Sequence, residues 1–141
     1  MTKPPAQPAL AAGFGCRQGC EASVLRQLLE SALQSCRLDL SAVTGLASID
    51  GKRHEPGLLE LARQLQLPLL FFSATALQPY EPHLSHRSSL AFAHTGCHGV
   101  AESAALALAE QQGQSPASLL ISRQKHPQAT FALAWTGQNP G

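Results

Sequence analysis

The sequence predicts a three-layer α/β/α fold whose mostly parallel, mixed sheet has about five strands and ends in an antiparallel hairpin. Three short apolar runs alternate with two segments of helical periodicity, an order typical of parallel strands joined by right-handed crossovers. Two further apolar runs close the chain with only a short polar stretch between them, which favours a hairpin. The 141 residues, 44% hydrophobic and 13% charged, fit one globular domain.

The first strand and helix are indicated by residues 10–36. Residues 10–15 form an apolar run that ends in glycine, where the chain can turn sharply. The next apolar residues recur in pairs every four positions, which predicts an amphipathic helix from about Cys20 to Cys36. These residues are Val24, Leu25, Leu28, Leu29, Ala32 and Leu33.

The second and third strands are predicted over 43–49 and 68–72. A helix begins near Pro56, because proline suits the first helical turn. The continuous apolarity of 68–72 is typical of a strand covered on both faces. A short helical turn is expected at 73–77.

The carboxyl-terminal half begins with the least regular stretch, 78–99, which holds four of the six histidines: His83, His86, His94 and His98. A helix is predicted over 100–111, followed by hairpin strands over 117–122 and 130–135. We expect one domain over 9–136, with loose tails over 1–8 and 137–141.

Composition excludes several functions. A formal net charge of +1 argues against duplex nucleic acid as a partner. No apolar run approaches the roughly 18 residues that cross a bilayer. Prolines near the N-terminus disfavour a signal peptide, so a cytoplasmic protein is expected.

The four cysteines, Cys16, Cys20, Cys36 and Cys97, are too widely spread for a disulfide scaffold. Cys16 and Cys20, with His94, Cys97 and His98, would supply enough soft ligands for zinc. No CxxC pair supports such a site, so we expect neither a metal nor a cofactor.

A ligand site is expected at the carboxyl ends of the parallel strands, where open α/β sheets bind ligands. Three segments fall there: 15–19, 50–55 and 71–73. In the first, glycines let backbone amides approach an anion, and Arg17 adds a fork of donors. Alternatively these glycines only make a tight turn. Their spacing does not match the dinucleotide-binding fingerprint, because Gln18 stands where its last glycine is required.

Two candidates for chemistry lie in these segments. Asp50, His54 and Glu55 could supply acid–base groups; alternatively they form a solvated loop in which Glu55 complements the helix dipole. Cys16 could be a nucleophile activated by the following helix, although a packing role suits it as well.

Five segments in the same order resemble the cobalamin-biosynthesis family formed by CobE and the C-terminal domain of CbiG. The resemblance covers essentially the whole chain, and its specificity comes from the five motifs being in register. They are Gly13–Gly19, Leu46–Lys52, Glu55–Leu58, Pro68–Ala74 and Gly99–Leu106. Lys125 corresponds to a basic position before the last strand of the family.

The resemblance implies binding of a precorrin or corrin tetrapyrrole, whose acetate and propionate groups suit basic side chains and amides. Phe14 and Phe72 would cover the macrocycle, and Asp50 is the candidate for proton transfer. The implied ligand-binding residues are Gly15, Cys16, Arg17, Gly19, Lys52, Phe72, Ser73 and Glu102. Two roles stay open: a carrier that passes an intermediate between pathway enzymes, or an enzyme acting on the macrocycle as hydrolase or isomerase.

Overall fold

The computed structural model of the chain describes residues 8–85 and 99–136. Strands and helices alternate through the first half, and the chain closes with a helix and a hairpin. They are β1 (Leu10–Cys16), α1 (Ala22–Ser35), β2 (Gly45–Ile49), α2 (Pro56–Leu65), β3 (Leu69–Phe72), α3 (Ala74–Leu77), α5 (Val100–Gly113), β4 (Ser118–His126) and β5 (Ala129–Trp135). Short 3-10 helices lie at η1 (Leu40–Ala42), η2 (Asp50–Lys52) and η3 (Gln78–His83).

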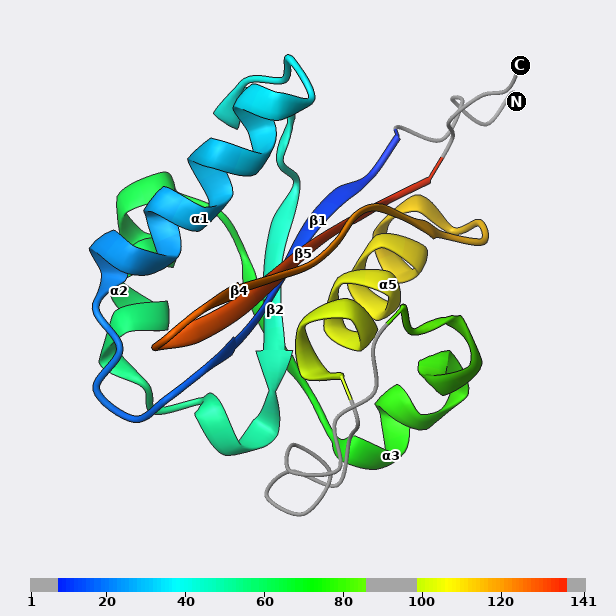
Figure 1. Cartoon of the computed structure of the whole chain (residues 1–141). Coiled ribbons are helices and arrows are strands. Elements are labelled where there is room, and N and C mark those ends of the chain that lie inside the picture. The colour runs from blue at the N-terminus through cyan, green and yellow to red at the C-terminus, as the bar shows by residue number, and fades with distance from the viewer. Residues whose placement is uncertain (1–7, 86–98, 137–141) are drawn as a thin grey trace, which may run out of the picture.

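The five strands form one mixed sheet in the order β3-β2-β1-β5-β4. β1, β2 and β3 are parallel, whereas β5 is antiparallel to both β1 and β4. Figure 1 shows α1 and α2 on one face of this sheet and α3 and α5 on the other. The predicted three-layer fold, with its parallel core and closing hairpin, is confirmed.

Alternate residues of each strand face different helices, as the pleat of a strand requires. Leu10, Ala12 and Phe14 of β1 lie in the core under α1 and α2, whereas Ala11 packs with α5. The Phe14 ring contacts the Phe131 ring of β5 at a centroid distance of 5.3 Å. The strands β1, β2 and β3 are therefore covered on both faces of the sheet, which explains why they are almost continuously apolar.

Helix α5 lies unusually close to the sheet. It is buried from Val100 through Ala109, which is typical of a helix packed all round. A Cβ atom on Gly13 would lie only 2.0 Å from the carbonyl oxygen of Ala101 and 2.7 Å from the Ala105 nitrogen. Gly13 therefore belongs to the packing of β1 against α5 and not to the turn that follows the strand.

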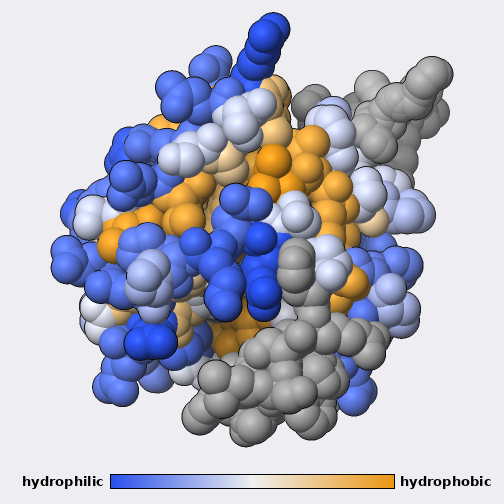
Figure 2. Space-filling view, in the orientation of Figure 1, coloured by the Kyte–Doolittle hydropathy of each residue, from blue (hydrophilic) through white to orange (hydrophobic). Residues whose placement is uncertain are grey.

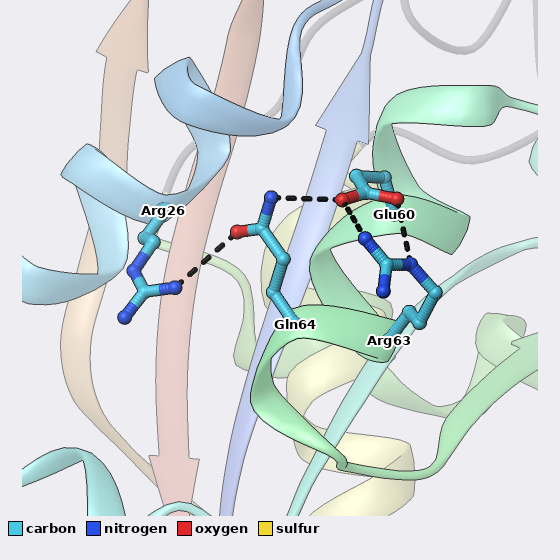
Figure 3. A network of polar contacts seen from close by, with 4 residues as sticks. All are labelled: Arg26, Glu60, Arg63 and Gln64. Carbon is cyan, nitrogen blue, oxygen red and sulfur yellow. Dashed lines mark hydrogen bonds and ion pairs between the residues drawn. The ribbon is translucent and has the colours of Figure 1, made fainter.

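On the opposite face, a surface network joins α1 to α2 (Figure 3). Arg26 of α1 donates to the amide oxygen of Gln64 at 3.2 Å, and the Gln64 amide donates to Glu60 at 3.0 Å. Glu60 also accepts from Arg63 at 2.9 Å. These contacts are exposed, so their contribution to stability is small.

The largest departure from the predicted elements is β4, which extends to His126 instead of ending at residue 122. It is an edge strand with register shifts between Leu119 and Ile121 and between Ile121 and Gln124. Edge strands are often polar and bulged, because such features discourage pairing with other chains. In the view of Figure 2, hydrophilic side chains cross the middle of the surface, and apolar side chains lie on either side of them. The second half of β4 is polar, so its sequence has no apolar pattern that would predict a strand.

The segment expected to be irregular, 78–99, begins with η3, which was not predicted. The rest of that segment from 86 to 98 lies outside the described residues, as do His86, His94 and His98. The predicted tails also lie outside them, apart from Pro8. No helix in residues 8–85 and 99–136 is long and apolar enough to span a membrane.

Candidate ligand-binding site

The three loops after β1, β2 and β3 meet in a cleft of about 590 Å³. The parallel strands direct them there, because the carboxyl ends of parallel neighbours lie at the same edge of the sheet (Figure 1). The lining residues are Cys16, Arg17, Ile49, Asp50, Gly51, Lys52, Ser73 and Ala74. The predicted convergence of the three segments is confirmed.

The loop after β1 is fixed by its backbone. The Arg17 amide donates to the Gln128 carbonyl at 2.9 Å, and the Cys20 amide donates to the Arg17 carbonyl at 3.1 Å. Gly19 has a φ of +84°, a conformation that glycine adopts without strain. The side chain of Arg17 is exposed, so this loop presents a guanidinium at the cleft while its main chain is held in place.

Glu55 contributes the third contact to this loop. It was expected either as an acid–base group or as a solvated charge at the start of a helix, but it is only 6% exposed. Its carboxylate accepts a hydrogen bond from the Gly19 amide at 2.9 Å. Glu55 does stand at the start of α2, as its N-cap residue, but its carboxylate is not solvated, because the turn after β1 covers it. An acid–base role for Glu55 stays a prediction.

Gly57 lets helix α2 approach the same loop. A Cβ atom on Gly57 would lie 2.1 Å from the carbonyl oxygen of Cys20, so no larger residue fits. Together, Glu55 and Gly57 bring the first turn of α2 against the Gly19 amide and the Cys20 carbonyl. This contact gives a physical reason for the glycine in the Glu55–Leu58 motif, which sequence reasoning had left without a role.

The loop after β2 carries one free cation and one paired acid. Asp50 forms an ion pair with Arg53 at 2.9 Å, and both side chains are substantially exposed. Lys52 is half-buried. Among the described residues, neither Lys52 nor Arg17 forms an ion pair. His54 is exposed and is not among the residues that line the cleft.

Cys16 lies at the end of β1, where the cleft begins. Burial raises the pKa of its thiol from the ordinary 9.0 to about 12, although nearby Lys52 opposes this shift. Only the thiolate is nucleophilic, so near neutral pH this side chain is a neutral packing group.

The loop after β3 contributes a hydroxyl. Ser73 is the N-cap of α3, and its Oγ accepts a hydrogen bond from the Ala76 amide at 3.0 Å. The hydroxyl proton stays available to a ligand, because a serine oxygen can accept and donate at once. Phe72, which precedes Ser73, packs with the α5 core and is not among the lining residues.

Three other residues named from the sequence lie elsewhere. Phe14 is completely buried, so the expectation that its ring covers a ligand is wrong. Gly15 packs against β5 and the start of α5: an added Cβ would lie 2.7 Å from Thr130 Oγ1 and 3.7 Å from Val100 Cβ. Glu102 is 1% exposed, and its carboxylate accepts hydrogen bonds from the Ser85 hydroxyl and from the amides of Ser85 and Arg123, each amide at 2.8 Å.

The cysteines and histidines in the described part of the chain form no group that could hold a metal ion. The candidate zinc ligands His94, Cys97 and His98 lie outside the described residues. Cys16, Cys20 and Cys36 are free thiols.

The arrangement is suited to holding anions. Arg17 and Lys52 bring two cations to one cleft, and the lone carboxylate among the lining residues, Asp50, is neutralised by Arg53. A guanidinium can bind a carboxylate through two parallel hydrogen bonds, and an ammonium adds a point charge.

Comparison with known proteins is consistent across sequence and structure. The profile of the family described as cobalamin synthesis G C-terminus matches residues 10–134. Protein CobE of Sinorhizobium sp is 34% identical over 125 residues, which cover 89% of this chain and 79% of that protein. A cobalt-precorrin-5A hydrolase of Priestia megaterium is 31% identical over 97 residues, covering 69% of this chain but 25% of the hydrolase.

Solved structures of cobalamin biosynthesis proteins are similar to this chain as well. The crystal structure of CobE from the cobalamin biosynthetic pathway superimposes with a TM-score of 0.91 at 46% identity, covering 96% of both chains. The cobalamin biosynthesis protein chiG of Agrobacterium tumefaciens str. C58 superimposes with a TM-score of 0.69 at 29% identity, covering 92% of this chain and all of that one. The resemblance found in the five motifs is confirmed, and the chain belongs to the CbiG C-terminal family of cobalamin biosynthesis proteins.

Proposed function

We propose that this protein binds a carboxylate-rich tetrapyrrole intermediate of cobalamin biosynthesis in the strand-end cleft and acts as its carrier. The observation that carries the proposal is the pair Arg17 and Lys52, which lie at one cleft and form no ion pair with another described residue. Their charges suit the acetate and propionate groups of a corrin intermediate. Amides and the Ser73 hydroxyl around the same cleft can add neutral donors.

A carrier suits the side chains at the cleft better than an enzyme does. The Cys16 thiol stays protonated near neutral pH, and the Asp50 carboxylate is held by Arg53. Among residues 8–85 and 99–136, neither side chain is paired with a group that would activate a nucleophile or tune a general base. The cleft is therefore equipped to hold a ligand, and nothing in its lining pairs an acid with a base.

The proposal is tested by binding and by product mass together. Purified protein is titrated with cobyrinic acid, a corrin whose acetate and propionate side chains are free, and with cobinamide, in which they are amides. We expect tight binding of the acid, much weaker binding of the amide and an unchanged mass of the recovered corrin. Failure to bind any carboxylated tetrapyrrole would remove the proposal.

Substitution of Arg17 tests whether its guanidinium binds a carboxylate of the ligand. Arg17→Ala should weaken binding of cobyrinic acid by about tenfold or more, because a bound carboxylate loses a charge-assisted pair. Arg26→Ala is the matched control, since Arg26 lies on the outer surface of α1 and pairs with Glu30. Equal affinities of the two variants would take Arg17 out of the site.

A second candidate function is hydrolysis of the macrocycle. It is favoured by the 38% identity over 72 residues to a cobalt-precorrin-5A hydrolase of Salmonella typhimurium, of which this chain covers 20%. Asp50 is the acid that lines the cleft. Turnover of a pathway intermediate, seen as a change of mass and abolished by Asp50→Asn, would establish the enzyme in place of the carrier.

A further inference from the structure

The loop that carries Arg17 is held at three points, and two of them are backbone carbonyl or amide contacts within or beside the loop. The third is the side chain of Glu55, which comes from a different element, the start of α2. It is a buried carboxylate that accepts from the Gly19 amide at 2.9 Å. Hydrogen bonds to an ionised acceptor are about twice as strong as those between neutral groups.

This third contact matters because of where it acts. Gly19 has a positive φ, and an added Cβ there would meet nothing within 4 Å, so no side-chain packing would fix this residue. Glycine also has the most backbone freedom to lose on folding. Among the described residues, the loop between Arg17 and Cys20 has no side-chain acceptor other than Glu55 to fix its conformation.

We infer that Glu55 is the positioning residue of the cleft: it holds the Arg17 guanidinium at the ligand through the Gly19 amide. The identity of the ligand rests on the proposed function, whereas the hydrogen bond does not. Glu55 itself does not touch the ligand, because it is buried behind the loop. Arg17 is exposed, so the Gln128 carbonyl and Glu55 fix its backbone from opposite ends of the turn.

A double-mutant cycle separates this role from general destabilisation. Cobyrinic acid affinity is measured for Arg17→Ala, for Glu55→Ala and for the pair. If Glu55 acts through Arg17, each single variant loses about tenfold and the double variant loses little more than either one. Losses that multiply to about a hundredfold would overturn the inference, because the two residues would then act independently.

The conservative variant gives a second readout. Glu55→Gln keeps an oxygen that can accept from Gly19, so it should recover most of the affinity that Glu55→Ala loses. Glu60→Ala is the matched control, since Glu60 lies on the same helix but is paired with Arg63 at the surface. Affinity in Glu60→Ala should equal that of the unmodified protein, and an equal loss in both alanine variants would overturn the inference.

The hydrogen bond from the Gly19 amide to Glu55 can also be observed without any ligand. In an amide NMR spectrum of the full chain, the Gly19 proton should move upfield in Glu55→Ala and by a smaller amount in Glu55→Gln. An unchanged Gly19 resonance would overturn the inference, even if the protein binds no tetrapyrrole. Conversely, if the unmodified chain binds no carboxylated corrin while Gly19 moves as expected, the proposed function fails and the anchor stands.

Discussion

The Cys16 side chain illustrates how burial changes the chemistry of a single residue. It lines the cleft, yet it is only 9% exposed, and burial raises the pKa of its thiol to about 12. A thiol at a strand end before a helix has the sequence position of an activated nucleophile. The structure instead places it in the core under α1, where the charged form is disfavoured.

We predict that Cys16 resists alkylation by iodoacetamide at pH 8, while the more accessible, half-buried Cys36 is modified before it. Peptide mass mapping of the native protein measures both sites. Modification of Cys16 at the rate of Cys36 would contradict the raised pKa.

The same shift has a consequence for stability. The pKa of the native thiol lies above that of the unfolded chain, so protonation favours the native state. This contribution is complete below about pH 9 and declines as the pH rises toward 12.

At the scale of elements, the contact of β1 with α5 depends on small residues on both sides. Gly13 faces the Ala101 carbonyl and the Ala105 nitrogen at distances that leave no space for a methyl group. Gly45 of β2 is similarly close to Gln112, 2.8 Å from its added Cβ position. The alanine-rich sequence of α5 is therefore explained by the closeness of its packing on the sheet.

Gly13→Ala should lower the free energy of unfolding by about 3 kcal/mol, because the added methyl group forces α5 away from the sheet. Gly51→Ala is the control: an added Cβ there meets nothing within 4 Å, and the change should stay within about 0.5 kcal/mol. Urea unfolding measures the free energy of unfolding of both variants, provided that the slope m is unchanged. Equal stabilities would show that α5 can move outward without cost.

Glu102 connects three elements in a way that sequence patterns do not reveal. The register shift of β4 frees the Arg123 amide, which turns to the Glu102 carboxylate instead of pairing with β5. The same carboxylate holds Ser85 after η3. A ligand-binding role for Glu102 stays a prediction, and its described contacts are all internal.

The sequence was sufficient to predict the sheet, because the apolar runs of β1, β2 and β3 follow directly from their burial between two helical layers. It also placed the three loops of the cleft together through the rule for parallel strands. The bond from Gly19 to Glu55 could not be predicted, since the two residues are 36 positions apart and no pattern links an amide to a carboxylate. The exposed half of β4 was missed for lack of an apolar signal.

At the scale of the whole molecule, the proposed binding would be coupled to folding through the cleft. Its lining comes from three loops that are separate in sequence, so a ligand that bridges them binds the native state only. At a ligand concentration of one hundred dissociation constants, the native state gains about 2.7 kcal/mol.

We therefore expect cobyrinic acid to raise the melting temperature by about 5–10 °C, given the size of the domain. Cobinamide should give a much smaller increase, since it lacks the carboxylates that Arg17 and Lys52 would bind. Differential scanning calorimetry over a range of ligand concentrations measures the effect. Equal shifts by the two corrins would show that charge does not govern recognition.

The anchored turn after β1 also has a kinetic consequence. Its conformation is fixed in the native state by Glu55, Gly57 and the Gln128 carbonyl, so a ligand would not have to order this turn on arrival. Association should then be limited by diffusion and by attraction to the two cations, and it should slow as salt is added.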